Sequence, residues 1–271
     1  MIDSKRIILI LNRSLKIVSH RLASLGRELK PDPVLILGNQ KSGTTAIASL
    51  LAQYLGSSAT LDMPALWGHL EQILGGEQQL AWFVKHYVSY FNRRVVKEPW
   101  LTFMTPELAQ IFPQAAFVLI LRDPRDNIRS LLDRLNLPGN LPANPLGLDK
   151  LPTGWKEIFY PALHSSAEVH YIDVLAERWN VAARLPGELE GRLCCTVRYE
   201  DFLRDKVLFI KDLAQALGYQ GRGNIQDDIH KQYQPAGKHR SVKWANFYGV
   251  ENLKKIEKRC GKFLAQYKYS P

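Results

Sequence analysis

Residues 34–45 read VLILGNQKSGTT. This stretch opens with apolar side chains, as expected of a strand buried inside a parallel sheet. Gly38 and Gly43 let the following turn curl so that successive N–H groups converge on one point. The helical pattern that starts at Thr44 directs the partial positive charge of a helix N-terminus at the same point. The stretch therefore predicts a strand, a phosphate-binding turn and a helix in direct succession.

Short β-rich runs alternate with helical runs along the rest of the chain. The alternation predicts an α/β fold of three layers, in which helices cover both faces of a central parallel sheet that carries a P-loop-like phosphate cradle. Thr105 and Pro106 are interpreted as the N-cap and first residue of one helix. The predicted strands span 34–37, 94–97, 116–121 and 194–198. The predicted helices span 44–55, 77–91, 106–111, 124–135, 167–185 and 208–217.

Composition limits the size of the core and the class of partner. The 271 residues, of which 46% are hydrophobic, are enough for one sizeable core, so we expect one domain over residues 33–271. A net charge of +10 favours anionic partners and leaves nucleic acid, acidic lipid and phosphorylated small molecules open. The three cysteines include the adjacent pair Cys194 and Cys195, a spacing unsuited to a disulfide framework. They predict a reducing compartment and hence a cytoplasmic location.

The N-terminal residues 1–32 are expected to form a separate element. Residues 2–29 fit a basic amphipathic helix, which we expect to pack on the domain rather than to lie on a membrane surface. Basic residues follow the apolar run 7–11 at once, so no stretch reaches membrane-spanning length and no signal peptide is expected.

The lysine of the phosphate-binding turn is displaced from its usual place. Loops that bind nucleoside triphosphates read G-x-x-x-x-G-K-[ST], whereas here Thr44 occupies the lysine position and Lys41 lies inside the turn. A lysine inside the turn projects toward a group beyond a single phosphate. This position argues against a P-loop kinase or nucleotide hydrolase, which is the main alternative interpretation.

Several segments resemble the PAPS-dependent sulfotransferases, where PAPS is 3′-phosphoadenosine 5′-phosphosulfate. K-S-G-T-T at 41–45 resembles the family's 5′-phosphosulfate loop, and 122–130 is similar to its 3′-phosphate motif, in which an arginine and a serine stand eight positions apart. The segment 198–202 resembles the family's Y-E-D segment, and 238–241 resembles its basic C-terminal loop. The resemblance spans roughly 33–248 and implies that the donor is bound by Lys41, Ser42, Gly43, Thr44, Thr45, Arg122, Ser130, Tyr199, Lys238, Arg240 and Ser241.

The chain departs from the cytosolic members at two positions. Ala46 stands where those members carry a tryptophan that stacks on adenine, and residues 96–100 lack their K-T-H-x-P histidine. The segment is closer to the K-x-P strand end of bacterial and Golgi-type members, which implies a glutamate base, here Glu98. Asp62 is the second candidate, because tyrosylprotein-type members carry their acidic base after the first helix.

The resemblance implies in-line transfer of a sulfuryl group from PAPS to a hydroxyl or amine of a small acceptor, with release of 3′-phosphoadenosine 5′-phosphate (PAP). Lys41 would stabilise the leaving oxygen, and no metal is expected. A non-catalytic nucleic-acid-binding module is the other alternative, although the sequence carries no nucleic-acid motif and no nucleic acid is expected.

Residues 136–161 are rich in proline and glycine and are predicted to form an irregular loop. We interpret this loop as a lid over the acceptor, with Trp155, Phe159 and Tyr160 lining the pocket. The alternative for each of these aromatic residues is that it anchors the loop to the core.

Overall fold

The computed structural model describes residues 14–164, 169–189, 191–221 and 223–269. The described residues form a parallel sheet of five strands in the order β2-β3-β1-β4-β5. The strands are β1 (Val34–Leu37), β2 (Ala59–Thr60), β3 (Val95–Lys97), β4 (Ala116–Leu121) and β5 (Leu193–Arg198).

Strand β1 lies at the centre of the sheet and is buried on both faces. Val34 is in register with Val95 of β3 on one side and with Ala116 of β4 on the other. Because side chains alternate along a strand, Leu35 and Leu37 pack into one hydrophobic core and Val34 and Ile36 into the other. The central strand therefore joins both cores.

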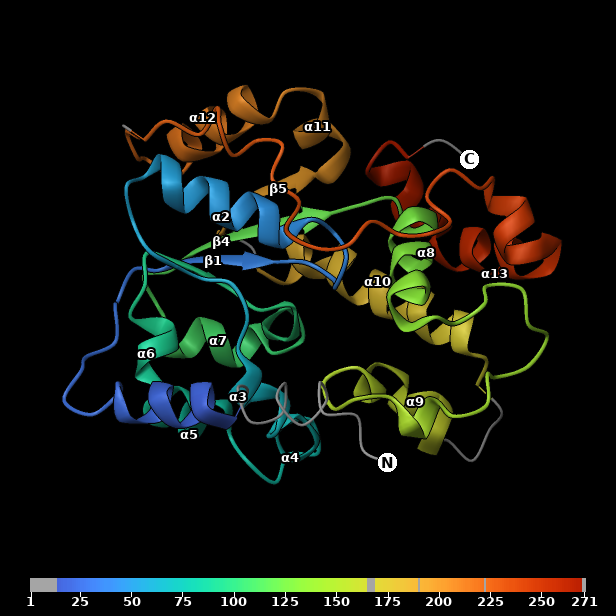
Figure 1. Ribbon diagram of the computed structural model, residues 1–271, viewed down its shortest axis with the longest axis horizontal. Coiled ribbons are helices and arrows are strands. Elements are labelled where there is room, and N and C mark those ends of the chain that lie inside the picture. Colours follow the sequence, from blue (N-terminus) through green and yellow to red (C-terminus); the bar gives the residue numbers. More distant parts are fainter. Residues whose placement is uncertain (1–13, 165–168, 190, 222, 270–271) are drawn as a thin grey trace.

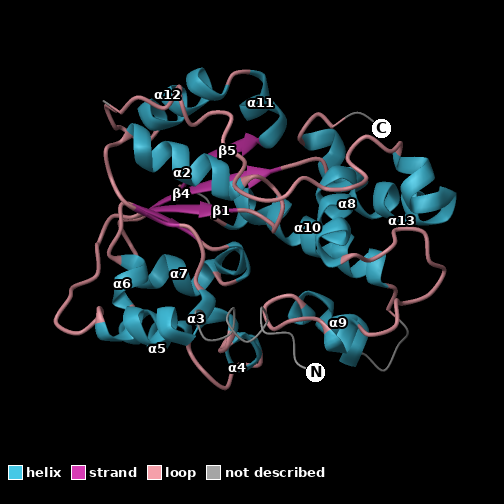
Figure 2. Cartoon of the chain, viewed as in Figure 1, coloured by secondary structure: helices cyan, strands magenta, loops and turns pink. Residues whose placement is uncertain are grey.

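Helices cover both faces of the sheet, which confirms the predicted three-layer α/β fold (Figures 1 and 2). On one face lie α2 (Thr44–Tyr54), α11 (Tyr199–Arg204) and α12 (Lys206–Ala216). The other face and the adjoining side are covered by α3 (Pro64–Trp67), α4 (Leu70–Leu74), α5 (Leu80–His86), α6 (Val88–Phe91), η1 (Pro99–Phe103), α7 (Thr105–Ile111), α8 (Pro124–Leu135), η2 (Leu148–Lys150), η3 (Lys156–Phe159), α9 (Tyr160–His164), α10 (Tyr171–Glu188) and α13 (Trp244–Gln266).

The strand order places a crevice at the carboxyl end of β1. The chain leaves β1 toward β2 and β3 on one side and then crosses to β4 and β5 on the other. Ligands of open parallel sheets bind where the strand order reverses in this way. The turn that follows β1 therefore lies at the position where a ligand is expected.

Several predicted elements differ from those observed. Strand β2 was not predicted, because two residues are too few to show a period. The predicted helix 77–91 is divided at Tyr87, whose backbone is not helical. Met104, not Thr105, is the N-cap of α7, and the Thr105 hydroxyl donates to the carbonyl of Thr102. The stretch 136–161 is less irregular than predicted, since it contains η2 and η3.

The predicted N-terminal helix lies only partly within the described residues, because 1–13 are outside them. Residues 14–22 are helical. The His20 ring stacks on Tyr90 with centroids 4.0 Å apart, and the Ser24 hydroxyl accepts from the N–H of Ser89 at 3.0 Å. Among the described helices, none combines the length and apolarity needed to cross a membrane.

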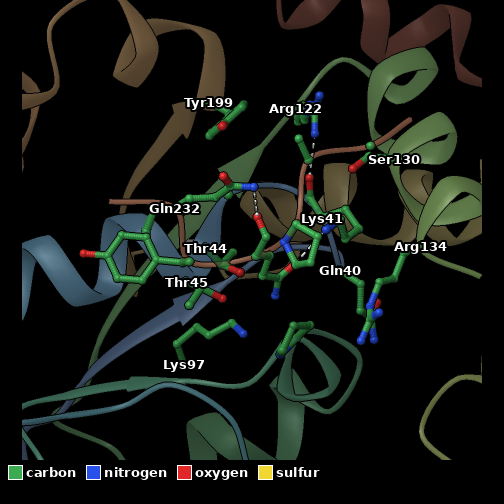
Figure 3. A pocket seen from close by; sticks show the side chains of 18 of the residues that line it. Gln40, Lys41, Thr44, Thr45, Lys97, Arg122, Ser130, Arg134, Tyr199 and Gln232 are labelled. Atoms are coloured by element: carbon green, nitrogen blue, oxygen red, sulfur yellow. Dashed lines mark hydrogen bonds between the residues drawn. The ribbon is translucent and has the colours of Figure 1, made fainter. Parts of the chain in front are cut away.

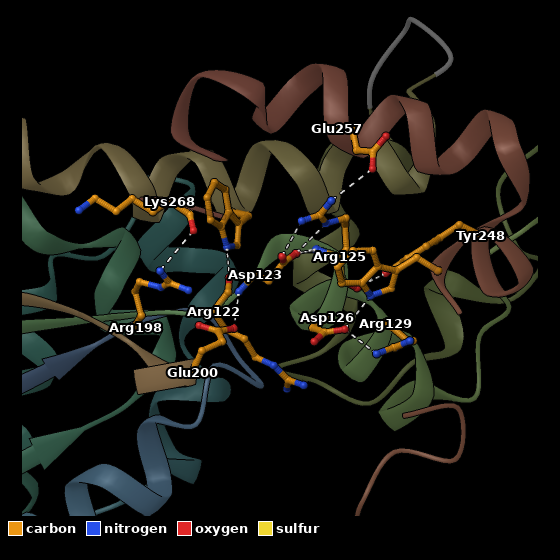
Figure 4. Close-up of polar contacts among 12 residues, drawn as sticks. Arg122, Asp123, Arg125, Asp126, Arg129, Arg198, Glu200, Tyr248, Glu257 and Lys268 are labelled. Carbon is orange, nitrogen blue, oxygen red and sulfur yellow. Dashed lines mark hydrogen bonds and ion pairs between the residues drawn. The ribbon is translucent and has the colours of Figure 1, made fainter. Parts of the chain in front are cut away.

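A buried group of charges joins α8 to α13 (Figure 4). Asp123 caps α8, and its carboxylate accepts from Arg125 Nε at 3.0 Å and Nη2 at 2.7 Å. The Arg125 guanidinium also lies 3.9 Å from the Trp244 ring centroid and pairs with Glu257 at 3.4 Å. Since the Arg125 side chain is 1% exposed, its charge depends on these partners.

We expect Arg125→Met to lower the free energy of unfolding by about 3–5 kcal/mol, because it leaves the nearly buried carboxylate of Asp123 without its cation. Urea denaturation monitored by circular dichroism measures the change. Arg204→Met is the matched control, since Arg204 is 74% exposed in its ion pair with Asp201 and its loss should cost at most about 1 kcal/mol. Equal, small losses in both variants would contradict the assigned role.

Candidate functional site

A cavity of about 870 Å³ opens at the carboxyl end of the sheet. Its walls come from residues 40–46 after β1, from Lys97–Trp100 after β3, from α8 after β4, and from α11 after β5. In Figure 3, Tyr199, Arg122 and Ser130 lie on one side of Lys41 and Lys97 lies on the other. The cavity therefore brings together residues from every long strand of the sheet.

Three carbonyl oxygens of the phosphate loop, residues 38–45, accept hydrogen bonds from side chains of other elements. The Thr102 hydroxyl donates to the carbonyl of Gly38 at 3.2 Å, Asn127 Nδ2 to that of Gln40 at 2.9 Å, and Arg122 Nη1 to that of Lys41 at 3.0 Å. Thr44 and Thr45 begin α2, where backbone N–H groups have no intrahelical partner. The N–H groups at the start of α2 are therefore free to bind an anion.

Glycine is required at both ends of this loop. Gly38 has φ 143°, and a Cβ there would lie 2.5 Å from the carbonyl oxygen of Ile120. Gly43 has φ 87°, and a Cβ there would lie 2.2 Å from the ring of Tyr199. Lys41 adopts φ 71°, a left-handed backbone conformation that is strained for residues other than glycine. The loop thus keeps Lys41 in a backbone geometry set by the packing around it.

Lys41 is a partly buried cation that loses its proton more readily than an exposed lysine. Burial, assisted by the nearby charges of Arg134 and Arg122, lowers the pKa of Lys41 from 10.5 to about 8. Its Nζ donates to Oε1 of Gln234 at 2.7 Å. An anion bound beside Nζ would favour the protonated form.

Arg122, Ser130 and Tyr199 line the same side of the cavity. The Arg122 guanidinium lies 5.1 Å from the Tyr199 ring centroid, and the carbonyl oxygen of Arg122 accepts from Trp179 Nε1 at 2.8 Å. The structure therefore places the arginine and the serine of the 122–130 segment beside the phosphate loop.

The other predicted donor-binding residues are divided. Arg240 lines the cavity. Lys238 lies beside a second cavity of about 430 Å³ and donates to Asn136 at 3.1 Å. Ser241 is exposed and lines neither cavity. Ser42 is 1% exposed and accepts from Asn127 Nδ2 at 3.1 Å, so it braces the loop from behind.

The two candidate bases differ in exposure. Glu98 is 1% exposed and accepts from Met63 N at 2.8 Å, Trp67 Nε1 at 3.1 Å and Trp100 N at 3.3 Å. Burial raises the pKa of Glu98 to about 6, against the opposing charge of Lys97. The Asp62 side chain is 45% exposed, and its Oδ1 pairs with Lys97 Nζ at 2.8 Å. Both carboxylates line the cavity.

Of the three aromatic residues assigned to the lid, only Trp155 lines the cavity. Phe159 is fully buried in the hydrophobic core, and Tyr160 is half-exposed away from the cavity. The prediction that all three face the acceptor was therefore wrong for Phe159 and Tyr160. Gly154, next to Trp155, packs on Trp67, and its carbonyl oxygen accepts from Trp100 Nε1 at 3.1 Å.

One wall of the cavity was missed in the sequence. Residues 229–237 line it and contact the phosphate loop through Gln234, the partner of Lys41. The segment is held by its neighbours, because His239 N and Nδ1 contact the Asp133 carboxylate at 3.1 and 2.5 Å. It carries no periodic pattern or known motif that would have located it. Asn127 was also missed, although it lies inside the quoted 122–130 segment.

The family model for sulfotransferases, described as "Sulfotransferase family", matches residues 69–221, more than half of the chain. The chain belongs to the sulfotransferase family. The match includes Glu98, Arg122, Ser130 and Tyr199, while the phosphate loop lies outside it. Transfer of a sulfuryl group is accordingly the activity of this protein, which is an enzyme.

Solved sulfotransferase structures share the fold. A sulfotransferase from Mycobacterium avium is 12% identical with a TM-score of 0.52, over 95% of this chain and 82% of that chain. A mouse sulfotransferase complexed with PAP is 14% identical with a TM-score of 0.50, over 93% of this chain and 94% of that chain. No curated protein sequence matches the chain.

We expect the rate of sulfuryl transfer to depend on the Lys41 proton. Its pKa of about 8 means that the cation is present below that pH and is lost above it, so kcat/KM for the sulfuryl donor should fall as pH rises through about 8. Lys41→Arg should move this fall out of the accessible range, since arginine stays protonated. Lys41→Ala should lower kcat by about 10² or more. An unchanged alkaline limb in Lys41→Arg would assign the titration to another group.

Proposed function

We propose that this sulfotransferase moves the sulfuryl group of PAPS to a hydroxyl or amine of a small acceptor. The observation that carries the proposal is the pairing of two anion sites in one cavity. The phosphate loop with Lys41 forms one, and Arg122 with Ser130 forms the other, with Tyr199 packed against both Gly43 and Arg122. A nucleotide phosphorylated at both its 5′ and 3′ positions fits such a pair.

In this proposal the donor is held along the wall formed by the loop and α8. Gly43, Thr44 and Thr45 offer N–H and hydroxyl donors to the 5′-phosphosulfate, while Arg122, Ser130 and Arg240 surround the 3′-phosphate. Because Ala46 is too small to stack on the adenine, the adenine is assigned to Tyr199, Phe202 and Tyr233, which line the same cavity. Ser42 supports the loop, and Lys238 and Ser241 are not needed as direct contacts.

The transfer itself is an in-line displacement. The acceptor oxygen or nitrogen forms a bond to sulfur while the bond from sulfur to the 5′-phosphate oxygen breaks, and the electron pair leaves with PAP. Lys41 is assigned to the charge that develops on that oxygen. The acceptor's proton passes to a carboxylate on the opposite wall.

Asp62 is the better placed of the two carboxylates for that proton. Both Glu98 oxygens accept N–H groups from the surrounding backbone and from Trp67, which suits a residue that shapes the acceptor wall. Asp62 is open to the cavity, and the nearly buried Lys97 holds it in place. Trp67 and Trp155 supply the apolar surface beside Asp62. Of the stretch 136–161, only residues 152–155 line the cavity, so we assign these four residues to the acceptor side.

The kinase and nucleic-acid interpretations have less support. The chain belongs to a sulfotransferase family, and Thr44 occupies the position of a triphosphate-binding lysine.

The three cysteines of the protein are free, which agrees with the proposed cytoplasmic location.

The test of donor identity compares PAP with adenosine 5′-phosphate by calorimetric titration. The wild-type protein should bind PAP much more tightly, since only PAP engages Arg122 and Ser130. Arg122→Ala should remove most of that difference, on the order of 1.5–3 kcal/mol for a charged hydrogen bond, and Ser130→Ala should remove less. A wild-type protein that prefers ATP with Mg²⁺ to PAP would refute the proposal.

The two carboxylates are separated by a second pair of variants. We expect Asp62→Asn to lower kcat by about 10²–10⁴ with the melting temperature nearly unchanged, because a general base is lost from an exposed position. Glu98→Gln should chiefly lower the melting temperature, because it weakens the contacts of a buried carboxylate. The reverse pattern would make Glu98 the base.

A further inference from the structure

Arg178 of α10 lies behind the phosphate loop, outside the cavity lining. Its guanidinium carbon is 3.6 Å from the ring centroid of Phe103 and 4.2 Å from that of Trp100. Its Nη2 donates to Oε1 of Gln40 at 3.2 Å. Gln40 precedes Lys41 and lines the cavity, as Figure 3 shows. Arg178 therefore touches the loop through a single residue.

Arg178 is partly buried, and it differs from the buried arginines in having no counter-charge among the described residues. Arg125 and Arg129 pair with Asp123 and Asp126. Within the described residues, no carboxylate lies within ion-pair distance of Arg178, and its buried Nε has no hydrogen-bond partner. Burial lowers the pKa of Arg178 to about 9, which reflects the same lack of compensation.

An unpaired cation in such surroundings destabilises the folded protein unless something else compensates it. Two aromatic faces offset part of the cost through their quadrupoles. The remaining compensation is available from an anion in the neighbouring loop. Both the backbone and the side chain of Gln40 are held in place, because its carbonyl oxygen accepts from Asn127 Nδ2 and its Oε1 accepts from Arg178 Nη2.

We infer that Arg178 is a positioning residue for the sulfuryl donor, whose unpaired positive charge strengthens anion binding in the phosphate loop and whose contact holds Gln40 beside Lys41. The inference rests on the proposed donor. A purely structural bridge between α10 and η1 would stabilise the protein whether or not an anion is bound, whereas the role inferred for Arg178 depends on the anion.

Arg178→Met tests this inference by removing the charge while keeping an apolar stem on Trp100 and Phe103. We expect it to weaken PAP binding about tenfold or more, as the loss of one nearby charge at low effective dielectric implies. Binding of adenosine, which carries no charge, should stay unchanged. The melting temperature of the ligand-free variant should be equal to or higher than that of the wild-type protein.

Two further variants complete the experiment. Arg178→Lys keeps the charge and should retain most of the PAP affinity. Arg184→Gln is the matched control on the same helix, where the exposed Arg184 pairs with Glu177, and it should change nothing. Calorimetric titration measures both ligands.

The inference is overturned if Arg178→Met binds PAP as the wild-type protein does, if it loses PAP and adenosine equally, or if Arg178→Lys is as impaired as Arg178→Met. A wild-type protein that binds no PAP would instead refute the proposed donor, and the inference would fall with it.

Discussion

The phosphate loop can keep its turn only while the carbonyl oxygens of that turn have hydrogen-bond donors. Those donors come from other elements: Thr102 of η1 holds Gly38, Asn127 of α8 holds Gln40, and Arg122 at the end of β4 holds Lys41. Each donor follows a strand that is paired with β1. The parallel sheet therefore shapes the loop indirectly, by placing the donors beside it.

Positive charge is compensated by carboxylates in the Arg125 group but not at Lys41 and Arg178. The Arg125 group is neutralised internally, by Asp123 and Glu257, and it fixes α13 to the start of α8. Around the cavity, Lys41 and Arg178 are left without carboxylates in contact among the described residues, and burial lowers the pKa of both. The folded protein thus leaves positive charges without carboxylate partners at the place where a doubly phosphorylated nucleotide would supply negative charge.

Local patterns carried the predictions that succeeded. A buried apolar run followed by a glycine turn identified β1 and the loop, whereas the resemblance of 122–130 to the family's motif pointed to Arg122, which contacts the loop. What the sequence could not reveal depends on distant partners: Thr102 and Gly38 are 64 positions apart, and Arg178 and Gln40 are 138 apart. Residues 229–237 share that property, since their place is set by Asp133 and Lys41 rather than by any periodicity.

The contact between Gly43 and Tyr199 also constrains how this site can evolve. The ring occupies the space that a side chain at position 43 would need. A larger residue at position 43 therefore requires the tyrosine ring to be lost first, and it also bears the strain of φ 87°. Restoring the ring then requires glycine to return first. The two positions are coupled in this order-dependent way, so change at position 43 is closed to the protein while the Tyr199 ring is in place.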